Sequence, residues 1–84
     1  MKILIRELET LYSILKEWNS ASDISKLLGF NYPRMLSILK VLRAGSLLEE
    51  KSQENDARIR LFKLSHKNLS FADFFLAFMR GYYG

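Results

Sequence analysis

The stretch FNYPRMLSILKVLRAG, residues 30–45, decides how the rest of the chain is organised. Asn31 is a favourable helix N-cap, because its side-chain oxygen can accept a backbone N–H that the first turn leaves unpaired. Pro33 falls in that first turn, where its missing N–H costs nothing. Gly45 is expected to end the helix, since a residue without a Cβ adopts the left-handed conformation easily. Between these ends runs an apolar face with helical spacing, formed by Met35, Ile38, Leu39 and Leu42.

The other face of this predicted helix has a different chemistry. Its side chains are basic, polar or aromatic, namely Tyr32, Arg34, Ser37, Lys40 and Arg43. One side of the helix therefore suits a core, and the other suits a partner. Leu36 and Val41 lie on or beside this second face, where they either pack against the wing that follows or dock a protein.

The net charge of +4 is concentrated in one part of the chain. Residues 1–30 hold four basic and four acidic side chains, and residues 68–84 hold one of each. Residues 31–67 hold eight basic side chains against four acidic ones, so the whole excess lies on this helix and just after it. A localised basic excess is typical of a protein with a polyanionic partner, although a solvated surface can also be basic.

Residues 3–18 are predicted to form the first helix. Their apolar stripe has helical period and consists of Leu4, Leu8, Leu11, Leu15 and Trp18. Residues 1–5 also fit a short strand, and the sequence leaves that alternative open.

A second helix is predicted over residues 21–28. Residues 19–22 break the preceding pattern, and Ser20 is placed to cap the new helix. Gly29 ends it, and the N-cap Asn31 follows almost at once. Two helices joined by so short a turn cross steeply, as in a helix-turn-helix.

After the central helix, the hydrophobic period changes from that of a helix to that of a strand. Residues 47–51 and 58–64 are predicted strands, and the polar residues 52–57 form the turn between them. The result is a two-stranded β-hairpin with Arg58 and Arg60 near its tip.

The last predicted helix begins after Ser70, a favourable N-cap residue, and is apolar over most of its circumference. Its stripe consists of Phe71, Phe74, Phe75, Phe78 and Tyr82, and only Asp73 and Arg80 are charged. One small domain has a single core to cover such a helix, so we expect a second copy of the chain to cover the rest.

Several classes of function are disfavoured by what the sequence lacks. With no cysteine and a single histidine, His66, no metal site is expected. The sequence has no nucleophile–base pair, carboxylate cluster or Gly-rich phosphate loop, so we expect no enzyme and no cofactor. The longest strongly apolar stretch, residues 74–79, is far below the ~20 residues of a membrane span. No signal peptide is evident, and a soluble cytoplasmic protein without a membrane partner is expected.

The order helix, helix-turn-helix, hairpin, helix resembles the winged-helix DNA-binding domains of small prokaryotic regulators of the MarR, ArsR and PadR type. The resemblance is carried by SASDISKLLGFNYPRMLSILKVLRAGSLLEE at residues 20–50 and ARIRLFKLS at residues 57–65. The matching positions are Asp23, Ile24, Ser25, Leu28, Gly29, Leu39, Leu42, Leu47, Leu48, Phe62, Leu64 and Ser65. The chain departs from the pattern at Ser46, because a leucine directly after Gly45 would be typical. This departure predicts a turn lengthened by one residue.

This resemblance implies an α+β, mostly helical fold: a winged helix-turn-helix of three helices and a two-stranded wing, with a C-terminal dimerisation helix. The winged helix would occupy residues 1–69 and the dimerisation helix residues 70–84 of the same compact domain. The implied dimer interface consists of Phe71, Phe74, Phe75, Phe78, Tyr82, Leu4 and Leu8. So short a regulator would suit a viral, plasmid or archaeal genome.

The implied function is that of a homodimeric, sequence-specific transcription regulator that reads an inverted repeat in double-stranded DNA. The residues expected to contact DNA are Tyr32, Arg34, Ser37, Lys40, Arg43, Arg58, Arg60, Ser20 and Ser22. Arg34 is placed to read guanine or to bind a phosphate, and Lys40 and Arg43 to bind phosphates. A non-specific architectural DNA binder and a winged helix used for protein–protein assembly remain the alternatives.

Overall fold

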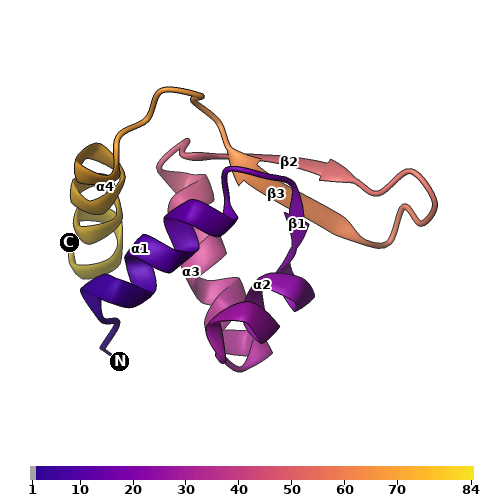
Figure 1. Cartoon of the computed structure of the whole chain (residues 1–84), viewed down its shortest axis with the longest axis horizontal. Coiled ribbons are helices and arrows are strands. Elements are labelled where there is room, and N and C mark those ends of the chain that lie inside the picture. The colour runs from indigo at the N-terminus through magenta and orange to yellow at the C-terminus, as the bar shows by residue number, and fades with distance from the viewer. Residues whose placement is uncertain (1) are drawn as a thin grey trace.

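The computed structural model describes residues 2–84, and Met1 lies outside the described residues. Four helices surround one end of a small antiparallel sheet (Figure 1). The elements in chain order are α1 (Ile5–Ile14), β1 (Asn19–Ser20), α2 (Ala21–Leu28), α3 (Tyr32–Ala44), β2 (Leu48–Ser52), β3 (Arg60–Leu64) and α4 (Phe71–Tyr83). The predicted α+β, mostly helical winged-helix class is confirmed.

Helix α1 is shorter than the sequence predicts at both ends. It begins after Leu4, whose backbone N–H donates to the Glu7 carboxylate at 2.8 Å. It ends because the side-chain amide of Asn19 donates to the carbonyl of Ile14 at 3.0 Å, which turns the chain out of the helix. Residues 2–4 form no strand, so that alternative is wrong for the described part of residues 1–5.

The strand β1 was not predicted. Asn19 pairs with Phe62 and Ser20 pairs with Leu61, so β1 adds a third strand next to β3, in the order β1-β3-β2. Ser20 is also the N-cap of α2, because its hydroxyl accepts the N–H of Asp23 at 3.1 Å. This two-residue strand therefore attaches the start of α2 directly to the hairpin.

The cap at the start of α3 is the one that sequence analysis predicted, and the cap at its end is not. Gly29 ends α2 with a left-handed φ of 72°, and Asn31 caps α3 by accepting the N–H of Arg34 at 2.9 Å. The expectation for Gly45 is wrong, since its φ is −84° and Ser46 instead adopts a φ of 61°.

The helix end has the hydrogen bonds of a Schellman motif. The N–H of Ser46 donates to the carbonyl of Arg43 at 3.0 Å, and that of Leu47 to the carbonyl of Leu42 at 2.9 Å. The turn therefore keeps its ordinary length, and Ser46 simply occupies the position that glycine usually takes. The expected extra residue is absent.

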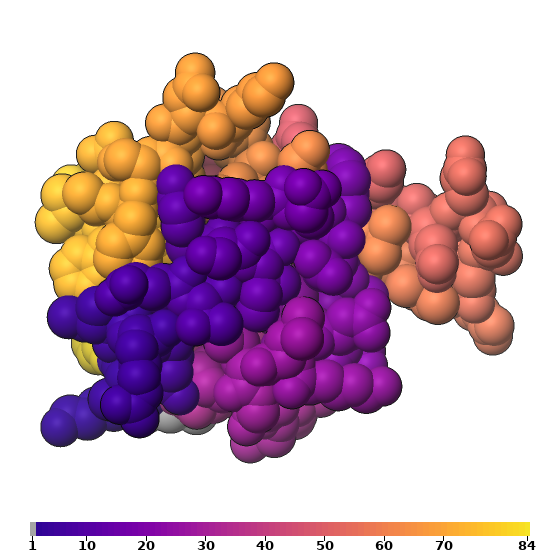
Figure 2. Space-filling model, viewed as in Figure 1, coloured from indigo at the N-terminus to yellow at the C-terminus, as the bar shows by residue number. Residues whose placement is uncertain are grey.

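Strands β2 and β3 form the predicted hairpin, which we call the wing. Leu48 faces Leu64 at its base, and Ser52 faces Arg60 at the other end of the pairing. Strand β3 begins at Arg60, so Arg58 lies in the turn and not in the strand as predicted. The tip of the wing projects beyond the body of the molecule (Figure 2).

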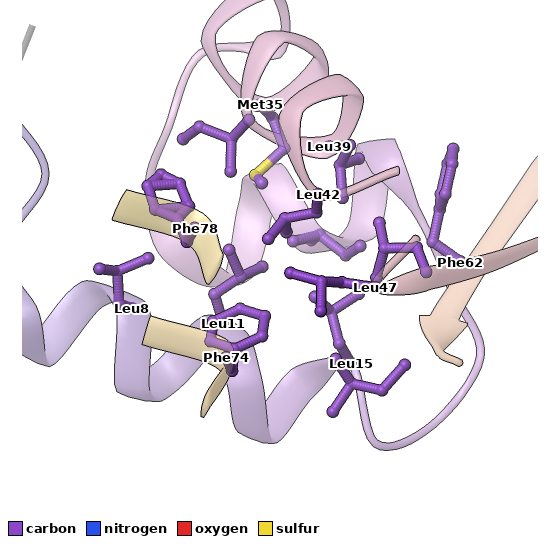
Figure 3. Close-up of a cluster of buried hydrophobic side chains, with 14 of the residues drawn as sticks. Leu8, Leu11, Leu15, Met35, Leu39, Leu42, Leu47, Phe62, Phe74 and Phe78 are labelled. Atoms are coloured by element: carbon purple, nitrogen blue, oxygen red, sulfur yellow. The ribbon is translucent and has the colours of Figure 1, made fainter. Parts of the chain in front are cut away.

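One hydrophobic core joins α1, α3, α4 and the base of the wing (Figure 3). Phe74 and Phe78 of α4 are fully buried in it, as is Leu8 of α1. These three residues were expected at a dimer interface, and that expectation is wrong because the chain's own helices cover them. Helix α4 is therefore packed into the same compact body as the rest of the chain.

Candidate nucleic-acid interface

A groove of about 620 Å³ opens between the start of α2, the exposed side of α3 and the wing. Its base includes apolar side chains, among them Leu36, Leu39 and Phe62. Its polar lining includes seven of the nine residues predicted to contact DNA, namely Ser20, Ser22, Tyr32, Lys40, Arg43, Arg58 and Arg60. Three elements distant in sequence thus present one continuous polar and basic surface.

Helix α3 presents Tyr32, Lys40 and Arg43 to this groove because they lie on the side of the helix that faces the wing. Tyr32 is half exposed, and Lys40 is also exposed. Leu36 lies among them as part of the groove. This position favours packing of Leu36 beside the wing over docking of a protein.

The two arginines nearest the junction of α3 and the wing share one carboxylate. Glu50 of β2 lies 2.8 Å from Arg43 and 2.7 Å from Arg60, measured between carboxylate oxygen and guanidinium nitrogen. Arg60 also donates to the hydroxyl of Ser52 at 2.6 Å. Sequence analysis missed Glu50 and Ser52, because only the strand register shows that they lie beside Arg60 on the wing.

At the tip of the wing, Arg58 is paired with Asp56. Its backbone N–H and its guanidinium both donate to the Asp56 carboxylate, at distances of 3.0–3.1 Å. These hydrogen bonds hold the pKa of Asp56 below its usual range, with the guanidinium the larger cause, and they raise the pKa of Arg58. The pair fixes the fold of the turn and leaves Arg58 exposed to a partner.

The structure does not bring Arg34 to the groove. Its guanidinium stacks on the ring of Phe30, 3.8 Å from the centroid, and donates to the carbonyl of Lys2 at 2.6 Å. Arg34 therefore holds the N-terminal segment against α3, and the expectation that it faces DNA is wrong in this structure. Ser37 is exposed but also outside the groove, and its hydroxyl donates to the carbonyl of Pro33 at 3.1 Å.

Val41 lies on the side of α3 that faces α4. A Cβ built on Gly81 of α4 would come within 3.0 Å of the Val41 side chain, so the two helices approach closely here. Val41 is half-buried and contacts α4, so the expectation that it packs against the wing is wrong.

An apolar surface remains at the other end of the molecule, where α1 packs against α4. Leu4 and Ile5 at the start of α1 are exposed, as are Leu76 and Tyr83 on α4. Other apolar side chains of α4 are only partly covered by the core, namely Phe71, Phe75, Met79 and Tyr82. We call this set of residues the α4 surface.

Two further observations bear on the class of protein. Within residues 2–84, no group of three or more His, Asp or Glu side chains is arranged to hold a metal ion. In the same part of the chain, no helix is both long enough and apolar enough to cross a bilayer.

A helix-turn-helix followed by a β-hairpin wing and closed by further helices defines the winged-helix class. The chain has the fold of winged-helix transcription regulators of the MarR type, as its resemblance to them implied.

Three solved structures illustrate the similarity. A mutant of ZitR from Lactococcus lactis has a TM-score of 0.69 at 19% identity, over 95% of this chain and 55% of that one. YusO from Bacillus subtilis has a TM-score of 0.69 at 15% identity, over 93% and 57%. A mutant of MepR from S. aureus, bound to an oligodeoxyribonucleotide, has a TM-score of 0.65 at 21% identity, over 92% and 54%.

These comparisons establish the fold. The chain spans little more than half the length of each of these three proteins. No protein-family model matches the sequence, and no curated protein matches it either.

Proposed function

We propose that this domain is a homodimeric transcription regulator that binds double-stranded DNA, with α3 in the major groove and the wing along its flank. The observation that carries the proposal is the groove, where Lys40 and Arg43 of α3 face Arg58 and Arg60 of the wing. A major groove about 12 Å wide admits one α-helix, and cations beside it bind phosphates and set the register. MepR, which shares the fold, was solved bound to an oligodeoxyribonucleotide.

Each part of the surface has a separate task in this proposal. Tyr32 at the start of α3 would contact base edges or a sugar, and Lys40 a phosphate. Ser20 and Ser22 lie at the start of α2, whose first-turn N–H groups can donate to another phosphate. Arg58 at the wing tip would reach the neighbouring minor groove.

The same proposal assigns the α4 surface to a second copy of the chain. Its residues are apolar, partly or fully exposed, and continuous with a helix whose only charges are Asp73 and Arg80. A two-fold dimer would place two α3 helices about 34 Å apart, which matches half-sites one helical turn apart. The remaining interface residues from sequence analysis are then Phe71, Phe75, Tyr82 and Leu4.

The first test is selection from a pool of random duplex DNA at two salt concentrations, followed by sequencing. An enriched inverted repeat is expected. Binding without enrichment that is lost at the higher salt would instead indicate an architectural DNA binder. No binding at either salt would refute DNA binding and favour protein–protein assembly.

Matched variants test the two surfaces separately. Lys40→Ala should weaken duplex binding and reduce the salt slope by about 1, as loss of one phosphate contact requires. Lys67→Ala removes the same charge from an exposed loop outside the groove and should do neither. Leu76→Glu should dissociate the dimer in analytical ultracentrifugation, whereas Leu27→Glu, at an equally exposed leucine on α2, should leave it intact.

A further inference from the structure

One carboxylate lies within the basic groove and holds two of its arginines. Glu50 is in the middle of β2, and its side chain is only 14% exposed. One of its oxygens is 2.8 Å from Nη1 of Arg43 on α3, and the other is 2.7 Å from Nε of Arg60 on β3. A single side chain thus connects the helix and the wing at the surface proposed to bind DNA.

Both arginines keep donors available for a partner. A guanidinium has five N–H donors, and the contacts with Glu50 and Ser52 involve only Nη1 of Arg43 and Nε and Nη1 of Arg60. The side chains of Arg43 and Arg60 are 63% and 47% exposed. Arg60 donates a charge-assisted hydrogen bond to Glu50, which is short and directional, and Arg43 forms an ion pair with the other carboxylate oxygen. Glu50 therefore restrains both guanidinium groups before any partner binds.

The position of Glu50 opposes simple attraction of DNA. A carboxylate in a polyanion-binding groove repels phosphates and offsets part of the charge of both arginines. Binding to duplex of arbitrary sequence depends mainly on the number of cations, so Glu50 weakens it. Binding to one site also depends on where the cations are held, because ordering a free arginine on binding costs conformational entropy.

We propose that Glu50 is a positioning residue for DNA specificity. It holds Arg43 and Arg60 at a fixed separation that matches two phosphates of the correct site, and it lowers the affinity of the groove for all other duplex. This inference rests on the proposed DNA binding and deepens it, since it names what distinguishes one duplex from another at this surface.

Glu50→Gln tests the proposal by removing the charge and keeping the shape. The matched control is Glu49→Gln, which removes the same charge from the neighbouring exposed residue, paired across the sheet with Lys63. Affinities would be measured for the selected site and for random duplex over a range of salt concentrations, after circular dichroism confirms that each variant is folded.

We expect Glu50→Gln to bind random duplex more tightly and to steepen the salt slope by up to about 0.9 for each arginine that gains a phosphate. The ratio of selected-site to random affinity should fall about fivefold or more, because one specific contact contributes at least about 1 kcal/mol of discrimination. Glu49→Gln should leave that ratio unchanged. Equal behaviour of the two variants would overturn the proposal. Ser52→Ala should also lower the ratio, by less, while leaving the salt slope unchanged, because it removes one of the two hydrogen bonds that hold Arg60 without changing charge.

A measurement without DNA separates this inference from the proposed function. Nitrogen-15 relaxation should show rigid Nε–H groups for Arg43 and Arg60 in the wild-type protein and mobile ones in Glu50→Gln. Equal mobility in the two proteins would overturn the positioning role even where DNA binding is confirmed. A wild-type protein that binds no duplex would refute the proposed function and the role of Glu50 in it, whatever the relaxation data show.

Discussion

Replacing Ser46 with glycine should stabilise the fold, because Ser46 has a backbone conformation that is unfavourable for any residue with a Cβ. Its φ is +61°, the one positive φ outside glycine in the part of the chain that the structure describes. Its hydrogen bonds use the backbone: the N–H donates to Arg43, and the carbonyl accepts the hydroxyl of Ser65 at 2.8 Å. Glycine keeps both of these groups.

The expected magnitude follows from two opposing terms. The left-handed conformation costs an L-residue about 1–2 kcal/mol, which glycine avoids. The greater freedom of glycine in the unfolded chain offsets about 0.5–1 kcal/mol of that gain. The net increase in the free energy of unfolding is therefore about 0–1.5 kcal/mol, and its middle value of about 0.75 kcal/mol corresponds to roughly 3–6 °C in melting temperature for a domain of this size.

Thermal unfolding followed by circular dichroism would measure this difference at one fixed protein concentration, because the proposed self-association would make the melting temperature depend on concentration. Gly29→Ala is the reverse control: Gly29 has a φ of +72°, and no atom lies within 4 Å of the Cβ that it would gain. That variant should lose about 1 kcal/mol or more from backbone strain alone. If Gly29→Ala melts lower as expected but Ser46→Gly fails to melt above wild type, the strain argument is refuted.

Three other predictions concern the core, the N-terminal segment and the wing tip. Phe74→Ala should reduce the free energy of unfolding by about 3–5 kcal/mol in chemical denaturation, because the ring is fully buried; a loss below 1 kcal/mol would contradict its place in the core. Arg34→Ala should lower the melting temperature but weaken duplex binding less than Lys40→Ala does, and the opposite order would show that Arg34 turns toward DNA. Arg58→Gln should raise the pKa of Asp56 towards its ordinary value of 3.8 in an NMR titration. Because the folded-state pKa of Asp56 is lowered, its contribution to stability is present above the unfolded-state pKa and is lost as the pH falls through the folded-state value. Arg58→Gln should reduce this acid dependence without removing it, because the backbone N–H of residue 58 still donates to Asp56.

The features that sequence analysis predicted correctly are those with local causes. Asn31 and Ser70 cap their helices through the backbone N–H of the third residue that follows, so a few neighbouring residues carry the whole signal. Gly29 ends α2 in the left-handed conformation for an equally local reason. These caps, together with helical spacing, were enough to predict α2 and α3.

The errors arise where distant parts of the chain meet. β1 has only two residues and shows no periodicity, so its pairing with β3 becomes visible only in three dimensions. The apolar stripe of α4 could not show which surface covers Phe74 and Phe78, because the chain's own core and a second copy attract them by the same effect. Arg34 was expected at the groove, but the aromatic ring of Phe30 and a carbonyl of the N-terminal segment hold it elsewhere.

The net positive charge of the groove is lower than the number of its basic residues suggests. One copy alone would therefore bind duplex weakly, so the proposed DNA binding depends on the proposed dimer. Four cations line it, but the carboxylates of Asp23 and Glu50 do too, which leaves two net positive charges per copy. At about −0.9 per neutralised phosphate, even four phosphate contacts would give one copy a salt slope of only about −4, whereas a protein with strong salt dependence makes about 6–10 phosphate contacts. A dimer doubles the slope and makes binding of the second half-site intramolecular. Leu76→Glu lies outside the groove, yet it should strongly weaken duplex binding at ordinary salt if the proposed dimer forms through the α4 surface.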